Sequence, residues 1–257
     1  MKRRDCLIVA LAMLCGAGVQ AQNPREISEK AANAIEFESM EMASTLTILD
    51  GKGNSRERKV AVATRKFGEA TKTLMRFLSP AEVQGTSILI HDYEKKSDDM
   101  WVYLPSLRKS RRIVSSEKGK SFMGSEFTNA DMAKPNLDDF DYKLLGAENI
   151  DGKECWKIEA TPKNDNVVNE NGFSRRVSYI EKNTYLMVRS EFYNKADKLN
   201  KVQILSDYRK QPNGKYFTYS MSMENKLSGR RSEMKVDQFQ LGSKLDEGSF
   251  STASLEK

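Results

Sequence analysis

Few residues in this chain could carry acid–base or nucleophilic chemistry. It contains one histidine, His91, which lies in the alternating run from Ser87 to Tyr93. No G-x-S-x-G nucleophile motif, phosphate-binding glycine loop or H-E-x-x-H zinc motif is present. A serine–histidine mechanism would have to use His91, and a lone histidine in a strand is more often structural. We therefore predict that the protein is not an enzyme, with His91 as its one catalytic candidate.

A group of acidic residues close in sequence is the candidate for a metal site. Carboxylates are the ligands that hard cations prefer, but the spacing of this group matches no calcium-binding loop and favours a solvated acidic turn. The candidates are Asp131, Asp138, Asp139 and Asp141. One cysteine, Cys155, remains beyond the N-terminal segment, and with a single histidine it cannot form a zinc site. We expect no cofactor.

Aromatic and basic residues occur together in one stretch. Trp101 and Tyr103 alternate with aliphatic residues, so both faces of their strand are predicted to be covered. Arg111 and Arg112 follow closely. An arginine pair beside an apolar strand suits an amphipathic anion, with the guanidinium on a phosphate or carboxylate and the tail on the apolar wall. The alternative is a solvated, charged edge strand, which the charge alone favours.

A long segment without strand character separates two groups of strands. Residues 117–135 are rich in Gly, Ser and Lys, and their large apolar residues are Phe122, Met123, Phe127 and Met132. A loop passing only through water gains nothing from such side chains. We therefore expect residues 118–132 to form a lid over an apolar cavity, with a plain surface loop as the alternative.

Methionine is the second indication of a cavity. Met221 and Met223 share one face of a predicted strand with Phe217 and Tyr219. Methionine is flexible and common on apolar binding surfaces, although ordinary core packing is the alternative for any single one. We place Met221 and Met223 among the expected ligand-binding residues.

The elements that position these residues are predicted to be almost all strands. One helix is expected from Pro24 to Glu36, and from about residue 40 the apolar period is two. The strand candidates are 44–49, 58–66, 71–78, 87–93, 100–104, 110–115, 142–148, 155–161, 174–181, 186–193, 201–209, 216–225 and 231–240. Without crossover helices, they predict a mainly β fold with one antiparallel meander, too large to stay flat.

The N-terminus reads as a secretory signal peptide. Three basic residues precede an apolar run that is short for a membrane span, and Val19-Gln20-Ala21 is a small-x-small cleavage site. Cleavage after Ala21 removes residues 1–21 and leaves residues 22–257 as one predicted β domain. It also lowers the formal net charge from +6 to +4, and this mild charge argues against nucleic-acid binding. Acylation of Cys15 is the disfavoured alternative, because Leu14 precedes it.

Residues 77–131 resemble a known family. The matching motifs are Phe77-Leu78-Ser79-Pro80, Gly85-Thr86, Trp101-Val102-Tyr103-Leu104-Pro105, Arg111-Arg112-Ile113, Phe122-Met123-Gly124-Ser125-Glu126-Phe127 and Asp131. They are similar to those of the outer membrane lipoprotein-sorting proteins, relatives of the carriers LolA and LolB. Glu126 departs from the family pattern, which has Asp there.

The resemblance implies an unclosed, or half, β-barrel whose concave apolar face is covered by short helices acting as a lid. It also implies a periplasmic protein that binds lipid or lipoprotein acyl chains, makes transient membrane contact and works beside an exporter of the resistance-nodulation-division (RND) type. The alternatives are a lipid-ester hydrolase on the same scaffold and a non-catalytic adaptor of such an exporter. The sequence leaves the identity of the lipid open.

Overall fold

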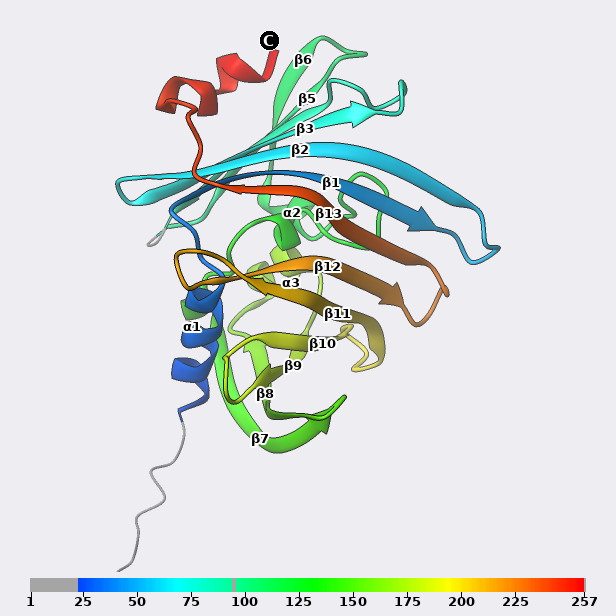
Figure 1. The fold of residues 1–257 in the computed structure, drawn as a ribbon. Helices are drawn as coiled ribbons and strands as arrows, with labels where there is room; N and C mark the ends of the chain where they lie inside the picture. Colours follow the sequence, from blue (N-terminus) through cyan, green and yellow to red (C-terminus); the bar gives the residue numbers. More distant parts are fainter. Residues whose placement is uncertain (1–22, 94–95, 257) are drawn as a thin grey trace, which may run out of the picture.

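The computed structural model of the protein describes residues 23–93 and 96–256 (Figure 1). The predicted signal peptide and the predicted mature N-terminus, Gln22, lie outside these residues. The described strands are β1 (Ser39–Leu49), β2 (Ser55–Phe67), β3 (Ala70–Ser79), β4 (Ser87–Tyr93), β5 (Asp99–Leu104), β6 (Lys109–Ile113), β7 (Phe140–Ile150), β8 (Lys153–Pro162), β9 (Arg175–Glu181), β10 (Met187–Tyr193), β11 (Leu199–Lys210), β12 (Tyr216–Asn225) and β13 (Arg231–Leu241). The described helices are α1 (Pro24–Ala34), α2 (Ser115–Lys118) and α3 (Asp165–Asn171), with short 3-10 turns η1 (Ala130–Met132), η2 (Leu137–Asp139), η3 (Glu247–Phe250) and η4 (Thr252–Glu256).

Within the described part of the chain, the strands form one antiparallel sheet of thirteen. Their order is β6-β5-β4-β3-β2-β1-β13-β12-β11-β10-β9-β8-β7. The predicted meander is correct for every pair of consecutive strands except β6 and β7. These two are the free edges of the sheet, and β1 pairs with β13 at its centre instead, with Leu46 opposite Met234. The sheet curls into an unclosed half-barrel, with short helices over its concave face (Figure 1).

Helix α1 begins at a well-defined cap. The side chain of Asn23 accepts a hydrogen bond from the Arg25 N–H, and Pro24 occupies the first turn, where it needs no donor. Ile27 is the buried residue of the helix, and it packs against Trp156 and Ile158 on β8. This anchor lays α1 along the side of the barrel formed by β7 to β10 (Figure 1). No described helix is long and apolar enough to cross a bilayer.

The larger core lies on the concave face, with most of its residues on the first half of the sheet. Alternating residues of β1 to β5 meet there, and the fully buried Leu46, Val60 and Phe77 are typical of them. A smaller core lies on the opposite face of β2 to β5. There the C-terminal turns η3 and η4 place Phe250 and Leu255 against Leu89. The strands β4 and β5 are therefore covered on both faces, as the sequence predicts for β5.

Candidate functional site

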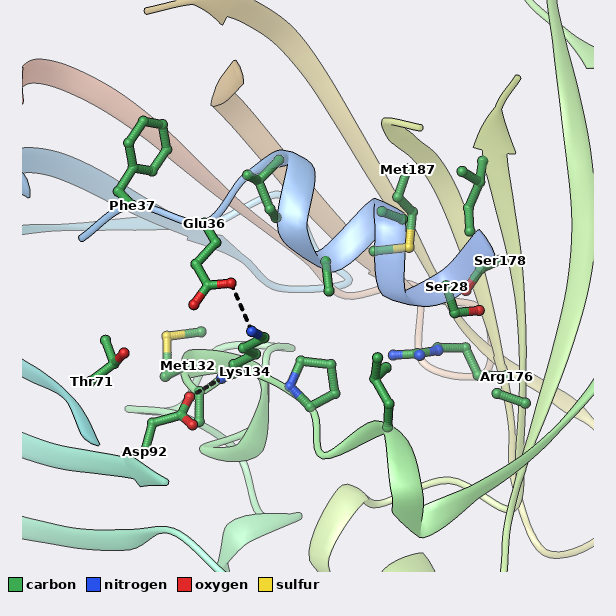
Figure 2. Close-up of a pocket in the computed structure, with 18 of the residues that line it drawn as sticks. Ser28, Glu36, Phe37, Thr71, Asp92, Met132, Lys134, Arg176, Ser178 and Met187 are labelled. Atoms are coloured by element: carbon green, nitrogen blue, oxygen red, sulfur yellow. Dashed lines mark hydrogen bonds and ion pairs between the residues drawn. The ribbon is translucent and has the colours of Figure 1, made fainter. Parts of the chain in front are cut away.

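A cavity of about 350 Å³ lies between the concave face of the sheet and the segments that cross it (Figure 2). This volume is within the range of small-molecule binding sites, roughly 300–1,000 Å³. Most of the wall is aliphatic or sulfur-containing. Its larger apolar residues are Ile35, Phe37, Met40, Ile90, Met132, Leu137, Ile158, Ile180 and Met187. Such a wall favours an apolar ligand.

Two segments cover the cavity. One is α1, which contributes Ser28, Ala31 and Ala32 to the lining. The other is the strap, which we define as residues 132–137, between η1 and η2. Met132, Ala133, Lys134, Pro135 and Leu137 of the strap line the cavity. The segments over the cavity are thus α1 and the strap, whereas the predicted lid was residues 118–132, of which Met132 alone lines the cavity.

Polar contacts of Lys134 tie the strap down at two points. Its ammonium group lies 2.9 Å from the carboxylate of Glu36, just after α1, and its backbone N–H donates to the carboxylate of Asp92 on β4 at 2.8 Å. Figure 2 shows both contacts at one side of the cavity. Burial raises the pKa of Asp92 to about 7, with the negative charge of Asp98 acting in the same direction. One anchor of the strap therefore titrates near neutral pH.

Arg176 and Tyr142 are polar groups in this apolar wall. Arg176 shares the concave side of β9 with Ser178 and Ile180, and all three line the cavity. The Arg176 Nε and the Tyr142 hydroxyl are buried, and neither has a hydrogen-bond partner among the described residues. Burial lowers the pKa of Arg176 and raises that of Tyr142. The guanidinium stays protonated, because arginine is not deprotonated in proteins.

The segment expected to be the lid forms a plug hairpin, which we define as residues 121–128. A bridge pairs Ser121 with Thr128, and the turn between them has left-handed backbone at Met123 and Gly124. Phe122 and Phe127 are each 1% exposed and belong to the larger core. The hairpin covers the concave face as expected, but it lies beside the cavity.

Polar contacts hold the plug hairpin to β2, β11 and β13. The Glu126 N–H donates to the Ser232 hydroxyl at 2.9 Å, and Lys201 donates to the Glu126 carbonyl at 2.5 Å. Arg58 donates to the Met123 carbonyl. The Glu126 carboxylate pairs with Arg230 at 2.8 Å. These contacts make the hairpin a fixed part of the core.

Of the ten residues expected to bind ligand, Met132 lines the cavity. Trp101 and Tyr103 pack on the convex side of the sheet, beside the C-terminal turns. Arg111 and Arg112 are exposed and pair with Glu117 and Asp99. The remaining five contact the larger core: Phe122, Met123, Phe127, Met221 and Met223. A role in ligand binding for the nine residues outside the cavity stays a prediction.

The catalytic candidate and two of the metal candidates are held by other contacts. His91 shares a hydrogen bond of 2.8 Å with the Phe250 carbonyl and packs against the Trp101 ring, on the convex face. Asp138 accepts from Arg25 at 2.7 Å, and Asp131 accepts from the Thr128 N–H at 2.7 Å. Across residues 23–93 and 96–256, no three His, Cys, Asp or Glu side chains are grouped so that they could hold a metal ion.

Comparison with known proteins agrees with this architecture. Residues 69–257 match the profile of a protein family described as "Uncharacterized protein". The chain belongs to this family. Among solved structures, a DUF1329 family protein from Desulfovibrio piger is 29% identical, with a TM-score of 0.83 over 90% of this chain and 97% of that one. No curated protein matches the chain.

Two further structures connect the family to the LolA-like fold. A domain assigned to an outer membrane lipoprotein-sorting protein from Vibrio parahaemolyticus has a TM-score of 0.84 and 24% identity, over 91% of this chain and 98% of that one. A LolA superfamily protein from Nitrosomonas europaea has a TM-score of 0.72 and 20% identity, over 91% of this chain and 100% of that one. These matches confirm the resemblance stated from the sequence and establish the LolA-like fold.

Proposed function

We propose that the protein is a carrier that holds the acyl chains of a lipid or lipoprotein in the cavity. The observation that carries the proposal is the apolar cavity enclosed between the half-barrel, α1 and the strap. Burying an acyl chain there contributes about 0.8 kcal/mol per CH₂ group, so a long chain can be bound tightly without covalent chemistry. The LolA-like fold, shared with the lipoprotein-sorting protein domain from Vibrio parahaemolyticus, supports the same function.

The cellular setting belongs to the same proposal. We infer export through the signal peptide, cleavage after Ala21 and action in the periplasm, with transient contact to a membrane or to an RND-type exporter. The three basic residues, apolar run and small-x-small site at the N-terminus support export. N-terminal sequencing of the protein from the envelope fraction tests it. Intact Met1, or an acylated Cys15, would contradict this proposal.

A variant that fills the cavity tests the carrier function. Ala32 on α1 lines the cavity, whereas the neighbouring Asn33 is exposed. Ala32→Trp places an indole where the acyl chain would lie, and Asn33→Trp places the same group in solvent. We expect Ala32→Trp to weaken binding of a fluorescent fatty acid at least tenfold and Asn33→Trp to leave it unchanged. Equal binding by both variants, with matching thermal melts, would contradict the proposal.

A further inference from the structure

Arg176 is a cation in an apolar cavity, and no ion pair with it is found among the described residues. Figure 2 shows its guanidinium pointing from β9 into the cavity, toward the strap. Among residues 23–93 and 96–256, no carboxylate forms an ion pair with it, and its Nε has no acceptor. The negative charge of Asp131 acts on Arg176 to raise its pKa, although no ion pair joins the two side chains. The Asp131 carboxyl instead accepts a hydrogen bond from the Thr128 N–H at 2.7 Å.

The adjacent arginine, Arg175, does have carboxylate partners. Arg175, on the other face of β9, lies 2.7 Å from Asp197 and 3.3 Å from Glu159. A buried charge is costly unless it is paired and hydrogen-bonded. Arg176 is half-buried and its buried Nε is unpaired, which is a cost that an anion entering the cavity would remove.

The surroundings of Arg176 leave it free to accept an anion. The rings of Phe140 and Phe173 lie 5.9 Å and 5.8 Å from the guanidinium carbon, so they flank the cation without using its N–H donors. Tyr142 also lines the cavity, and its buried hydroxyl has no hydrogen-bond partner among the described residues. Like the guanidinium, this hydroxyl can donate a hydrogen bond. A guanidinium fork and a hydroxyl together match an oxyanion.

We infer that the cavity binds a single-chain amphiphile with an oxyanion head, a carboxylate or a phosphate, on Arg176 and Tyr142. The acyl tail lies along Ile158, Ile180 and Met187. This inference rests on the proposed carrier function and names the ligand class of the same cavity. The esterified acyl chains of a lipoprotein lack such a head, so the inference separates the two cargoes.

The test compares ligands that differ only in the head group. Palmitate, lysophosphatidic acid with a palmitoyl chain and neutral methyl palmitate are titrated by displacement of a fluorescent fatty acid. The proteins are the parent, Arg176→Gln, Arg176→Lys and Tyr142→Phe. Arg209→Gln is the matched control, because Arg209 is exposed and pairs with Asp207.

We expect the parent to bind at least one of the two anions tenfold more tightly than methyl palmitate, and Arg176→Gln to lose this preference. Arg176→Lys should retain part of it, Tyr142→Phe should weaken the anion severalfold, and Arg209→Gln should match the parent. Which anion binds more tightly identifies the head as carboxylate or phosphate. Because the guanidinium of Arg176 is unpaired, Arg176→Gln should melt at or above the temperature of the parent.

Two results would overturn the inference. Equal affinity of the parent for methyl palmitate and both anions would leave the carrier function intact and remove the oxyanion site. A fall in melting temperature of Arg176→Gln, with equal loss of all three ligands, would mean that Arg176 has a structural role. Failure of every ligand to bind the parent would contradict the carrier function itself.

Discussion

The ammonium group of Lys134 lies 2.9 Å from the carboxylate of Glu36, and this ion pair joins the two segments that cover the cavity. Glu36 follows α1 and Lys134 belongs to the strap. A ligand that enters between α1 and the strap has to separate these two segments, because both line the cavity. The pair is partly exposed, so its contribution is modest, about 0.2–1 kcal/mol.

Charge reversal at this pair should speed ligand release. Glu36→Lys or Lys134→Glu replaces an attraction by a repulsion, and we expect the dissociation rate of a bound fluorescent fatty acid to rise about two- to fivefold. The double variant Glu36→Lys/Lys134→Glu restores the attraction and should return the rate toward that of the parent. Stopped-flow measurements at low salt check this. Unchanged rates in both single variants would mean that ligand leaves by another route.

The titration of Asp92 should make stability depend on pH. Burial raises its pKa to about 7, so between about pH 4 and pH 7 the folded protein holds a proton that the unfolded chain has lost. The contribution of Asp92 to the free energy of unfolding therefore falls as the pH rises through this window. Asp92→Asn removes the dependence while keeping an acceptor for the Lys134 N–H.

We expect Asp92→Asn to be more stable than the parent at pH 8, by on the order of 1–3 kcal/mol, and about equal to it at pH 4. Urea unfolding at the two pH values measures this difference. Burial also raises the pKa of the nearby Asp98, so this residue can add to the pH dependence. Asp98→Asn, measured in the same way, separates its contribution from that of Asp92. If the parent instead becomes less stable than Asp92→Asn as the pH falls, the pH dependence has the opposite sign and the prediction is wrong.

Residues of the plug hairpin and of the strap should respond differently to truncation. Phe127 is 1% exposed in the larger core, so Phe127→Ala should lower the free energy of unfolding by about 3–5 kcal/mol. Met132 lines the cavity, so Met132→Ala should mainly weaken lipid binding, with a smaller loss of stability. Thermal melts and fatty-acid titrations of both variants check this. Equal melting temperatures would contradict the core position of the hairpin.

The convex face should contribute stability and no binding. Phe250 is 1% exposed beneath the C-terminal turns, where it contacts the Phe67 ring at 5.5 Å between centroids. Phe250→Ala should lower stability by about 3–5 kcal/mol and leave fatty-acid affinity unchanged. Weaker affinity in the folded variant would indicate that Trp101 and Tyr103, which share this cluster, take part in binding after all.

Alternation made most of the fold predictable. The predicted strands 87–93 and 216–225 coincide with β4 and β12, and the others differ at their ends by a few residues. Period two is a local property of the chain, so a single sequence reveals it. The pairing of β1 with β13 joins the two ends of the chain at the centre of the open sheet. No local pattern of either strand indicates it.

The site was harder to predict, because a cavity joins residues that are distant in the chain. Met132 was identified by its position in an apolar segment that interrupts the strands. Arg176 was missed, although it alternates with Ser178 and Ile180 on one strand face. Which face of 174–181 is concave depends on pairing with β8, and the absence of a partner for Arg176 depends on the whole fold.

The central pair of β1 with β13 bears on the order in which the protein can fold. One edge of β1 pairs with β2, the next strand in the chain. The other edge pairs with β13, the last strand in the chain, and stays open until β13 is added. Pairing between strands so far apart is slow, and an open edge invites pairing with other chains. We expect the emerging N-terminal half to need a chaperone until β13 arrives, and a chain cut before residue 231 to aggregate through β1.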